Sequence, residues 1–244
     1  MKVTWSIHTR LLDTHTDVVG GLAPDSFDKV TRSTIPLLDY WREPAARLDS
    51  LTAQLGWPPF SEAELSFERQ VPVANGKGKA SFTDLMILGD QGAIAIEAKY
   101  TEPPYETVAE WLAQGNQANR ALVLDGWLAR IGEATGTAVA RPGVAALPYQ
   151  LIHRAASACS VASARRAVVY QVFDDKHLQH YQESLRTFAG CLTPSSTLSL
   201  GVLLVPARLM PETPRSLNGN ALRDGLRGMP VYAFEEASWF ATTC

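Results

Sequence analysis

Two neighbouring apolar segments carry charged residues where a buried β-strand would normally carry none. The first, SFTDLMIL, contains Asp84, and the second, AIAIEAKY, contains Glu97 and Lys99. The tetrapeptide GDQG joins them, and its residue types tolerate the backbone angles of a tight turn. The pattern predicts a β-hairpin whose charges must be paired or bound to a metal ion, because an unpaired buried charge is costly.

The register of this hairpin brings its charges together. Folding it symmetrically about Asp90 and Gln91 places Asp84 opposite Glu97, where side chains of antiparallel strands lie ~5 Å apart. Lys99 returns to the same face two residues later, because side chains alternate along a strand. Two opposed carboxylates repel each other, and a hard divalent cation removes that repulsion. The cluster predicts a metal-dependent active site. The alternative is a structural ion pair between Lys99 and one carboxylate.

The rest of the hairpin is apolar on both faces, which is typical of a strand pair covered on each side. With helical patterns before and after it, this predicts an α/β fold in which a mixed sheet is flanked by helices on both faces. We expect the first strand at 68–74. We also expect one domain, in which 1–36 form an N-terminal cap, about 37–173 the core and 174–244 a C-terminal extension of the sheet.

The charged positions also resemble a known signature. Asp84, twelve intervening residues and then Glu97 and Lys99 in the tripeptide EAK are similar to the PD-(D/E)xK motif of the restriction-endonuclease-like nuclease superfamily. Thr83 stands where the motif has its name-giving proline, a substitution that the superfamily commonly tolerates. The resemblance covers about 37–173. It implies a restriction-endonuclease-like core and a divalent-metal phosphodiesterase that acts on nucleic acid.

The resemblance also implies roles for individual residues. Asp84, Glu97 and the backbone carbonyl of Ala98 would bind Mg²⁺ or Mn²⁺. Lys99 would position the attacking water and stabilise the transition state, leaving a 5′-phosphate and a 3′-hydroxyl. Superfamily members commonly add a glutamate from the helix before the sheet, and Glu43 is the expected one because it alone lies in that early helical segment. The other candidates follow it: Glu62, Glu64 and Glu68.

Two further groups of polar residues bear on a nuclease. Gln150 and Arg154 share one helical face, so Gln150 could hold the attacking water and Arg154 could bind a phosphate through two hydrogen bonds. The alternative is an ordinary amphipathic helix. Lys77 and Lys79, in the loop NGKGK, could contact a phosphate backbone, although a lysine-bearing turn also suits any exposed hairpin.

Composition bears on the cellular compartment and on how nucleic acid could bind, but it does not identify an activity. The net charge of −3 gives no overall attraction to nucleic acid, so binding must depend on a local basic patch. The cysteines are three and widely spaced, which favours reduced thiols over a disulfide framework: Cys159, Cys191 and Cys244. No apolar run reaches membrane-spanning length. We therefore expect a cytoplasmic protein.

Together these observations predict a Mg²⁺- or Mn²⁺-dependent nuclease, with DNA favoured over RNA and a homodimer compatible with cutting two strands. The first alternative is a catalytically inactive, nuclease-like module that binds nucleic acid or regulates. The second is a hydrolase of another phosphate ester. A groove lined beside the carboxylates by Lys77, Lys79, Arg120 and Arg154 would favour long nucleic acid, whereas a small closed pocket would favour a small ester.

Overall fold

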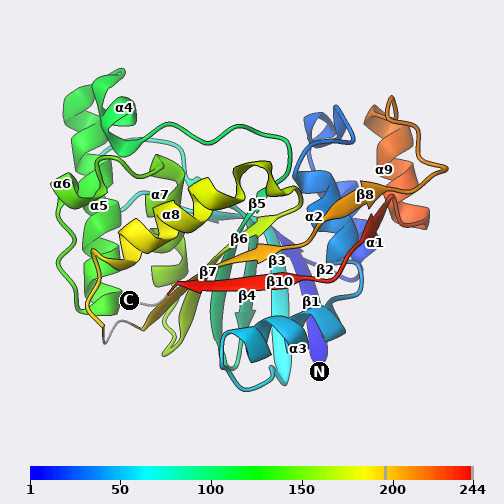
Figure 1. Ribbon diagram of the computed structural model, residues 1–244, viewed down its shortest axis with the longest axis horizontal. Helices are drawn as coiled ribbons and strands as arrows, with labels where there is room; N and C mark the ends of the chain where they lie inside the picture. Colours follow the sequence, from blue (N-terminus) through cyan, green and yellow to red (C-terminus); the bar gives the residue numbers. More distant parts are fainter. Residues whose placement is uncertain (195–196, 243–244) are drawn as a thin grey trace.

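An eight-stranded mixed β-sheet forms the centre of the protein, with helices on both faces (Figure 1). The computed structural model describes residues 1–194 and 197–242. The strand order is β10-β7-β6-β5-β4-β3-β1-β2. In chain order these strands are β1 (Lys2–Ile7), β2 (Arg10–Leu12), β3 (Glu62–Val71), β4 (Ser81–Gly89), β5 (Gly92–Lys99), β6 (Arg166–Val172), β7 (Leu198–Leu204) and β10 (Ser238–Thr242). The predicted α/β class and the mixed sheet are confirmed.

The predicted hairpin is formed by β4 and β5. These strands pair antiparallel, with Leu85 opposite Ile96 and Gly89 opposite Gly92, as the symmetric fold requires. Position 92 needs a glycine for a steric reason, since a Cβ there would lie 2.5 Å from the Trp57 ring. On the far side of β5, β6 pairs in parallel, and β7 pairs in parallel with β6.

Two hydrophobic cores, one on each face of the sheet, hold the helices in place. The leucine and isoleucine face of the hairpin packs with helices α1 (His15–Gly21), η1 (Pro24–Phe27), α2 (Thr34–Tyr40), α3 (Pro44–Gln54) and α9 (Gly219–Gly228). The opposite face packs mainly with α5 (Gln117–Thr135), α7 (Tyr149–Cys159) and α8 (Leu178–Ala189). Three short helices complete this side: α4 (Val108–Ala113), α6 (Arg141–Val144) and η2 (Asp175–His177).

The N-terminal segment differs from its prediction. Residues 1–36 do not form a separate cap, because β1 and β2 extend the sheet and β1 pairs in parallel with β3. Trp5 and Ile7 are buried in the core. The first core strand also starts earlier than predicted, at Glu62 rather than Glu68.

The C-terminal segment packs on the face of the sheet that α2 covers. A two-stranded sheet of β8 (Ala207–Leu209) and β9 (Tyr232–Phe234) lies there. The buried Asp39 anchors this small sheet, because its Oδ2 accepts hydrogen bonds from the backbone N–H groups of Val231 at 2.8 Å and Tyr232 at 2.7 Å. Cys159 and Cys191 are free thiols, and Cys244 lies outside the described residues. In the described part of the chain, no helix has the length and apolar character needed to cross a membrane.

Candidate active site

Asp84, Glu97 and Lys99 meet at the end of the hairpin, as the sequence predicts. The Lys99 Nζ lies 3.0 Å from Glu97 Oε1, and both side chains are buried. Asp84 lies one residue beyond the Leu85–Ile96 pair, so the register continues to Glu97. The Ala98 N–H donates to Asp84 Oδ2 at 2.8 Å, which ties the end of β4 to β5. The hairpin thus brings two carboxylates and an ammonium group together.

Glu97 is the centre of a buried ion-pair cluster. Arg154, on α7, donates through Nε to Glu97 Oε2 at 2.6 Å and through Nη2 to the same oxygen. Lys99 occupies the other oxygen. Burial alone would raise the pKa of Glu97, but the charges of Arg154 and Lys99 outweigh it and lower the pKa to about 2. Burial likewise opposes the charge of Lys99, yet Glu97 and Asp84 raise its pKa. Both groups are therefore charged.

The predicted role of Arg154 as a phosphate ligand needs correction. Its side chain is 1% exposed and both of its donor groups nearest the hairpin bind Glu97. Its Nη1 donates to the Phe82 carbonyl at 2.7 Å, and its Nη2 lies 3.8 Å from Asp84 Oδ1. Arg154 is a counterion of the carboxylates. A phosphate could reach it only by displacing Glu97, which would leave that buried carboxylate with less compensation.

Gln150 and His153 connect α7 to the same cluster. Gln150 Oε1 accepts a hydrogen bond from Lys99 Nζ at 2.7 Å, so it orients the ammonium rather than standing alone. His153 Nδ1 lies 2.8 Å from the Ser81 hydroxyl on β4. Burial, with the Arg154 charge, lowers the pKa of His153 to about 3, so this imidazole is neutral near pH 7. Together they fix α7 against the hairpin.

Glu68 is the third carboxylate of the site. The pairs Phe67–Leu85 and Arg69–Thr83 on either side place Glu68 opposite Asp84, so Asp84 has a carboxylate on each neighbouring strand. Glu68 has a φ of +48°, a strained conformation for a residue with a side chain. Burial first, and then the Glu97 charge, raise its pKa.

Glu43, the predicted additional glutamate, is not brought to this cluster. It is the residue that precedes α3, and it lines a different cavity with Val3 and Trp5. The glutamate that lies beside Asp84 is Glu68, which comes from a strand and not from the early helix.

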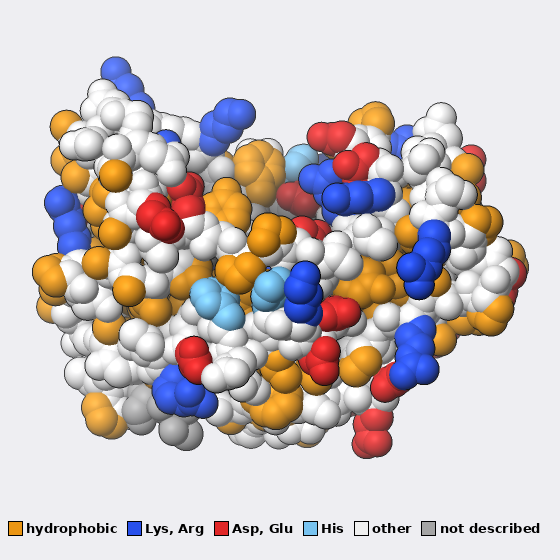
Figure 2. Space-filling model, turned by 45° about the horizontal axis from the view of Figure 1, so that its top comes forward, with side chains coloured by type: hydrophobic (Ala, Val, Ile, Leu, Met, Phe, Trp, Pro, Cys, Tyr) orange, Lys and Arg blue, Asp and Glu red, His pale blue; other side chains and the backbone are white. Residues whose placement is uncertain are grey.

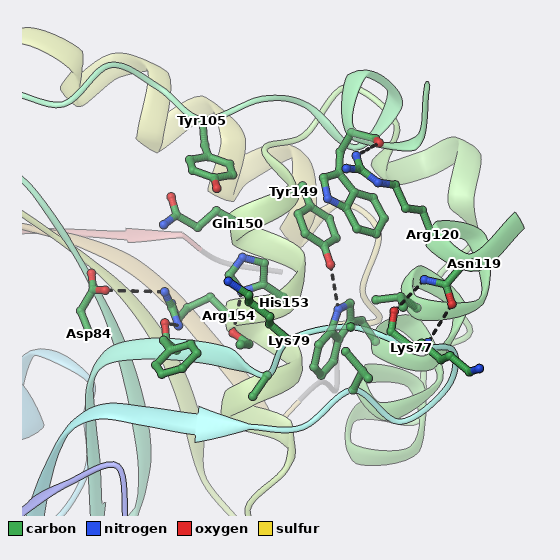
Figure 3. Close-up of a pocket in the computed structure, with 18 of the residues that line it drawn as sticks. Lys77, Lys79, Asp84, Tyr105, Asn119, Arg120, Tyr149, Gln150, His153 and Arg154 are labelled. Carbon is green, nitrogen blue, oxygen red and sulfur yellow. Dashed lines mark hydrogen bonds and ion pairs between the residues drawn. The ribbon is translucent and has the colours of Figure 1, made fainter. Parts of the chain in front are cut away.

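A cavity of about 610 Å³ opens beside the cluster (Figure 3). Asp84 and Gln150 lie toward one side of it, and Lys77, Asn119 and Arg120 toward the other. Although 26% of the Asp84 side chain stays exposed, the surrounding walls and the nearby Glu97 raise its pKa well above the usual range. The carboxylates at one end are therefore accompanied by Arg154 and Lys99, whereas Lys77 at the other end is a cation with no ion-pair partner among the described residues.

The loop between β3 and β4 carries Lys77 at the end of the cavity away from Asp84 and Lys79 near its middle, beside His153 (Figure 3). Asn119 on α5 binds this loop twice, accepting from the Lys77 N–H and donating to the Lys77 carbonyl, both at 2.7 Å. Within residues 1–194 and 197–242, neither lysine forms an ion pair, and both are exposed. Figure 2 shows one face hollowed between two raised parts that both carry basic side chains.

Comparison with known proteins places the chain in a family. A family model described as a domain of unknown function, DUF6946, matches residues 12–209. The chain belongs to the DUF6946 family. No curated protein and no solved structure matches it significantly. The segment shared with the DUF6946 model contains the hairpin, α7 and each carboxylate of the cluster.

The carboxylates of this DUF6946 domain suit a hard divalent cation in their chemistry. Among the described residues, no group of three or more His, Cys, Asp or Glu side chains could hold a metal ion by itself. Mg²⁺, however, usually keeps several waters and uses only one or two carboxylates together with substrate phosphates. The Ala98 N–H points to Asp84, and the N–H and C=O of one strand residue face the same side. The Ala98 carbonyl, predicted as a ligand, is therefore on the Asp84 side of β5.

Sequence reasoning missed Glu68 as the principal additional carboxylate in this DUF6946 domain. The signal was present, since pairing β3 with β4 around their connecting loop places Glu68 opposite Asp84. The predicted strand began at Glu68 itself, so its position within a longer strand was hidden. The pair between Arg154 and Glu97 had no local signal, because the two residues are 57 positions apart.

Proposed function

We propose that this DUF6946 protein is a divalent-metal-dependent nuclease that hydrolyses phosphodiester bonds, with DNA favoured as the substrate. The observation that carries the proposal is the placement of Lys99 against Glu97 in the strand next to Asp84. This is the arrangement that the resemblance to PD-(D/E)xK nucleases implies. Unpaired lysines in the cavity support a polyanionic substrate, because phosphates bind where cations are available.

Asp84 and the Ala98 carbonyl are the groups that would hold Mg²⁺ or Mn²⁺, with Glu68 adjacent. Glu97 would join them by exchanging one of its two cationic partners. Burial raises the pKa values of Asp84 and Glu68, and the Glu97 charge adds to this effect; a bound divalent cation would offset the carboxylate repulsion part of it. When bound, such an ion lowers the pKa of water and neutralises a phosphate.

Lys99 supplies the fixed positive charge at the reaction centre. Its raised pKa keeps it protonated, so it donates hydrogen bonds and does not act as a base. Gln150 takes one of those hydrogen bonds and Glu97 another, which leaves one N–H of the ammonium group for substrate or water. We propose that this N–H stabilises negative charge developing on the phosphate, and that Gln150 is a positioning residue.

One observation favours a second candidate, a nuclease-like module that binds nucleic acid without cutting it. Arg154 and Lys99 together satisfy both oxygens of Glu97, so the buried cluster is neutralised without any metal ion. Such a cluster is stable as a structural element. The module would keep the basic loop of Lys77 and Lys79 and lose only the chemistry.

Cleavage assays separate the two candidates. The protein is incubated with supercoiled plasmid, linear duplex, single-stranded DNA and RNA, each with Mg²⁺, Mn²⁺ or EDTA. The nuclease requires cutting that depends on metal and leaves 5′-phosphate ends. Binding without cutting of any substrate would instead support the inactive module.

A further inference from the structure

Two aromatic side chains stand exposed in the cavity that holds the carboxylates. Phe82 is 40% exposed and Tyr105 is 50% exposed, and both line this cavity. Phe82 precedes Asp84 by two residues on β4, so the two side chains lie on the same face. Because both rings line one cavity beside polar groups, they offer flat apolar surface to a ligand that binds there.

The back wall of the same cavity is already filled by stacked rings. Trp111 and Tyr149 stack with centroids 3.7 Å apart at an interplanar angle of 9°, and Arg120 lies over the Trp111 ring. The Trp127 N–H donates to the Tyr149 hydroxyl at 3.1 Å, which fixes this wall. Trp111 and Tyr149 each cover one ring face of the other, so those faces are not available to a ligand. Among the described residues, no ring packs on Tyr105, so its faces are available.

Tyr105 is also held in a defined place. Its neighbour Glu106 accepts the Tyr149 N–H at 2.9 Å, and the Val108 N–H donates to the Leu147 carbonyl at 2.8 Å. These bonds fasten the segment after β5 to the start of α7. Figure 3 shows Tyr105 above Gln150 at the cavity. These bonds fix the backbone beside Tyr105, so the ring stays at the cavity and only its side-chain rotation is restricted when a ligand stacks on it.

Cationic side chains in the cavity provide binding sites for the phosphates of a ligand. Lys77 provides a cation at one end of the cavity, Lys79 lies near its middle beside His153 and Arg154, and Asp84 marks the other end (Figure 3). Aromatic faces that alternate with cations along a groove bind single strands, because every unstacked base offers a π face and every nucleotide a phosphate. A duplex hides its base faces in the stack and offers only its phosphates to such a surface.

We propose that this cavity binds a single-stranded segment of nucleic acid, with unpaired bases stacked on Phe82 and Tyr105 and phosphates on Lys77 and Lys79. The inference rests on the proposed nuclease function and assigns its substrate as unpaired strands. The strand passes from the lysine loop toward Asp84. DNA and RNA share this stacking chemistry, so the test includes both.

The test measures binding in EDTA, where no cleavage occurs. Fluorescence anisotropy follows labelled 12-nucleotide dT, its RNA counterpart U and a 12-base-pair duplex bound to the intact protein. We expect a single strand to bind at least tenfold more tightly than the duplex. Each of Phe82→Ala and Tyr105→Ala should weaken single-strand binding by about 5- to 100-fold and leave duplex binding unchanged. Tyr105→Phe, which keeps the ring, should bind like the wild type.

The matched control is Phe240→Ala. Phe240 is 36% exposed but lies on β10, four strands away from β4 in the sheet. This variant should bind single strands with wild-type affinity. Equal affinity for duplex and single strand, or Phe82 and Tyr105 variants that bind as tightly as the wild type, would overturn the proposal. Tight single-strand binding without cleavage in Mg²⁺ would support the proposed single-strand binding and contradict only the proposed nuclease activity.

Discussion

Arg154 on α7 and Glu97 on β5 form a buried ion pair in which the guanidinium Nε donates to the carboxylate Oε2 at 2.6 Å. Each side chain is no more than 2% exposed. Lys99 binds the other carboxylate oxygen, so Glu97 has two cationic partners and Arg154 has one principal anion. The packing of α7 against the hairpin therefore depends on this contact, and the proposed chemistry uses the same carboxylate.

Arg154→Met should destabilise the protein strongly. Removing one partner leaves the buried Glu97 carboxylate undercompensated, and such losses cost about 3–5 kcal/mol. Adding Glu97→Gln to this variant removes the charge that lost its partner, so the double variant should recover part of the stability. Urea unfolding at pH 7 measures both. A cost below about 1 kcal/mol for Arg154→Met would show that Lys99 alone compensates Glu97.

Much of the site could be predicted because its signal is local. The hairpin register follows from a short turn and strict alternation, and it places Asp84, Glu97 and Lys99 within sixteen consecutive positions. The sheet class follows from the same alternation. The contacts that complete the site are distant in sequence, and their residues carry no mark of their partners.

The N-terminal strand shows the same limit. β1 pairs in parallel with β3, and Lys2 lies opposite Glu62, so the pairing joins segments sixty residues apart. A parallel neighbour leaves no turn signal between the two strands. The role of Arg154 failed for a related reason, because helical spacing showed which face it shares with Gln150 but not that this face is buried against β5.

Glu68→Gln should weaken Mn²⁺ binding, and Glu43→Gln should not. Glu68 lies opposite Asp84, whereas Glu43 is exposed and lines another cavity. We expect a several-fold loss of affinity for Glu68→Gln and a larger loss for Asp84→Asn, because each removes a negative charge from the cation site. Isothermal titration calorimetry measures the affinities. Wild-type affinity in Glu68→Gln, or a loss in Glu43→Gln, would contradict this assignment.

Gly76→Ala should lower nucleic-acid affinity through the lysine loop. Gly76 has a φ of +74°, and a Cβ there would lie 2.8 Å from a Val123 methyl and 3.1 Å from Asn119 Oδ1. The substitution therefore strains the loop and disturbs the Asn119 bonds that hold Lys77. Gly78→Ala is the control, since its Cβ would make only an ordinary contact of 4.0 Å with Val73. Equal nucleic-acid affinity of the two variants would contradict this prediction, because it would show that the geometry of the loop does not affect binding.

His15 should make the stability of the protein depend on pH. Burial lowers its pKa from 6.5 to about 4, while its Nε2 lies 2.9 Å from the Leu38 carbonyl. The unfolded chain binds the proton more readily than the native state. The contribution of His15 is therefore complete above pH 6.5 and falls as the pH decreases toward 4, by up to about 3 kcal/mol. In urea unfolding at pH 7 and pH 4.5, His15→Gln should show a smaller difference than the wild type. An identical difference would contradict the buried neutral state.

The central claim is that Lys99 and its carboxylates form a catalytic site, and Lys99→Met tests it most directly. Lys99→Met also removes a cationic partner of the buried Glu97, so this variant should lose stability, while Arg154 keeps its hydrogen bonds to Glu97. Urea unfolding therefore establishes first that the variant is folded under the assay conditions. The measurement is the single-turnover cleavage rate of a labelled oligonucleotide in Mg²⁺, with wild type and variant compared at equal bound fractions. We predict metal-dependent cleavage by the wild type and a loss of at least about 100-fold in the variant. Equal cleavage by a folded Lys99→Met protein would contradict the account.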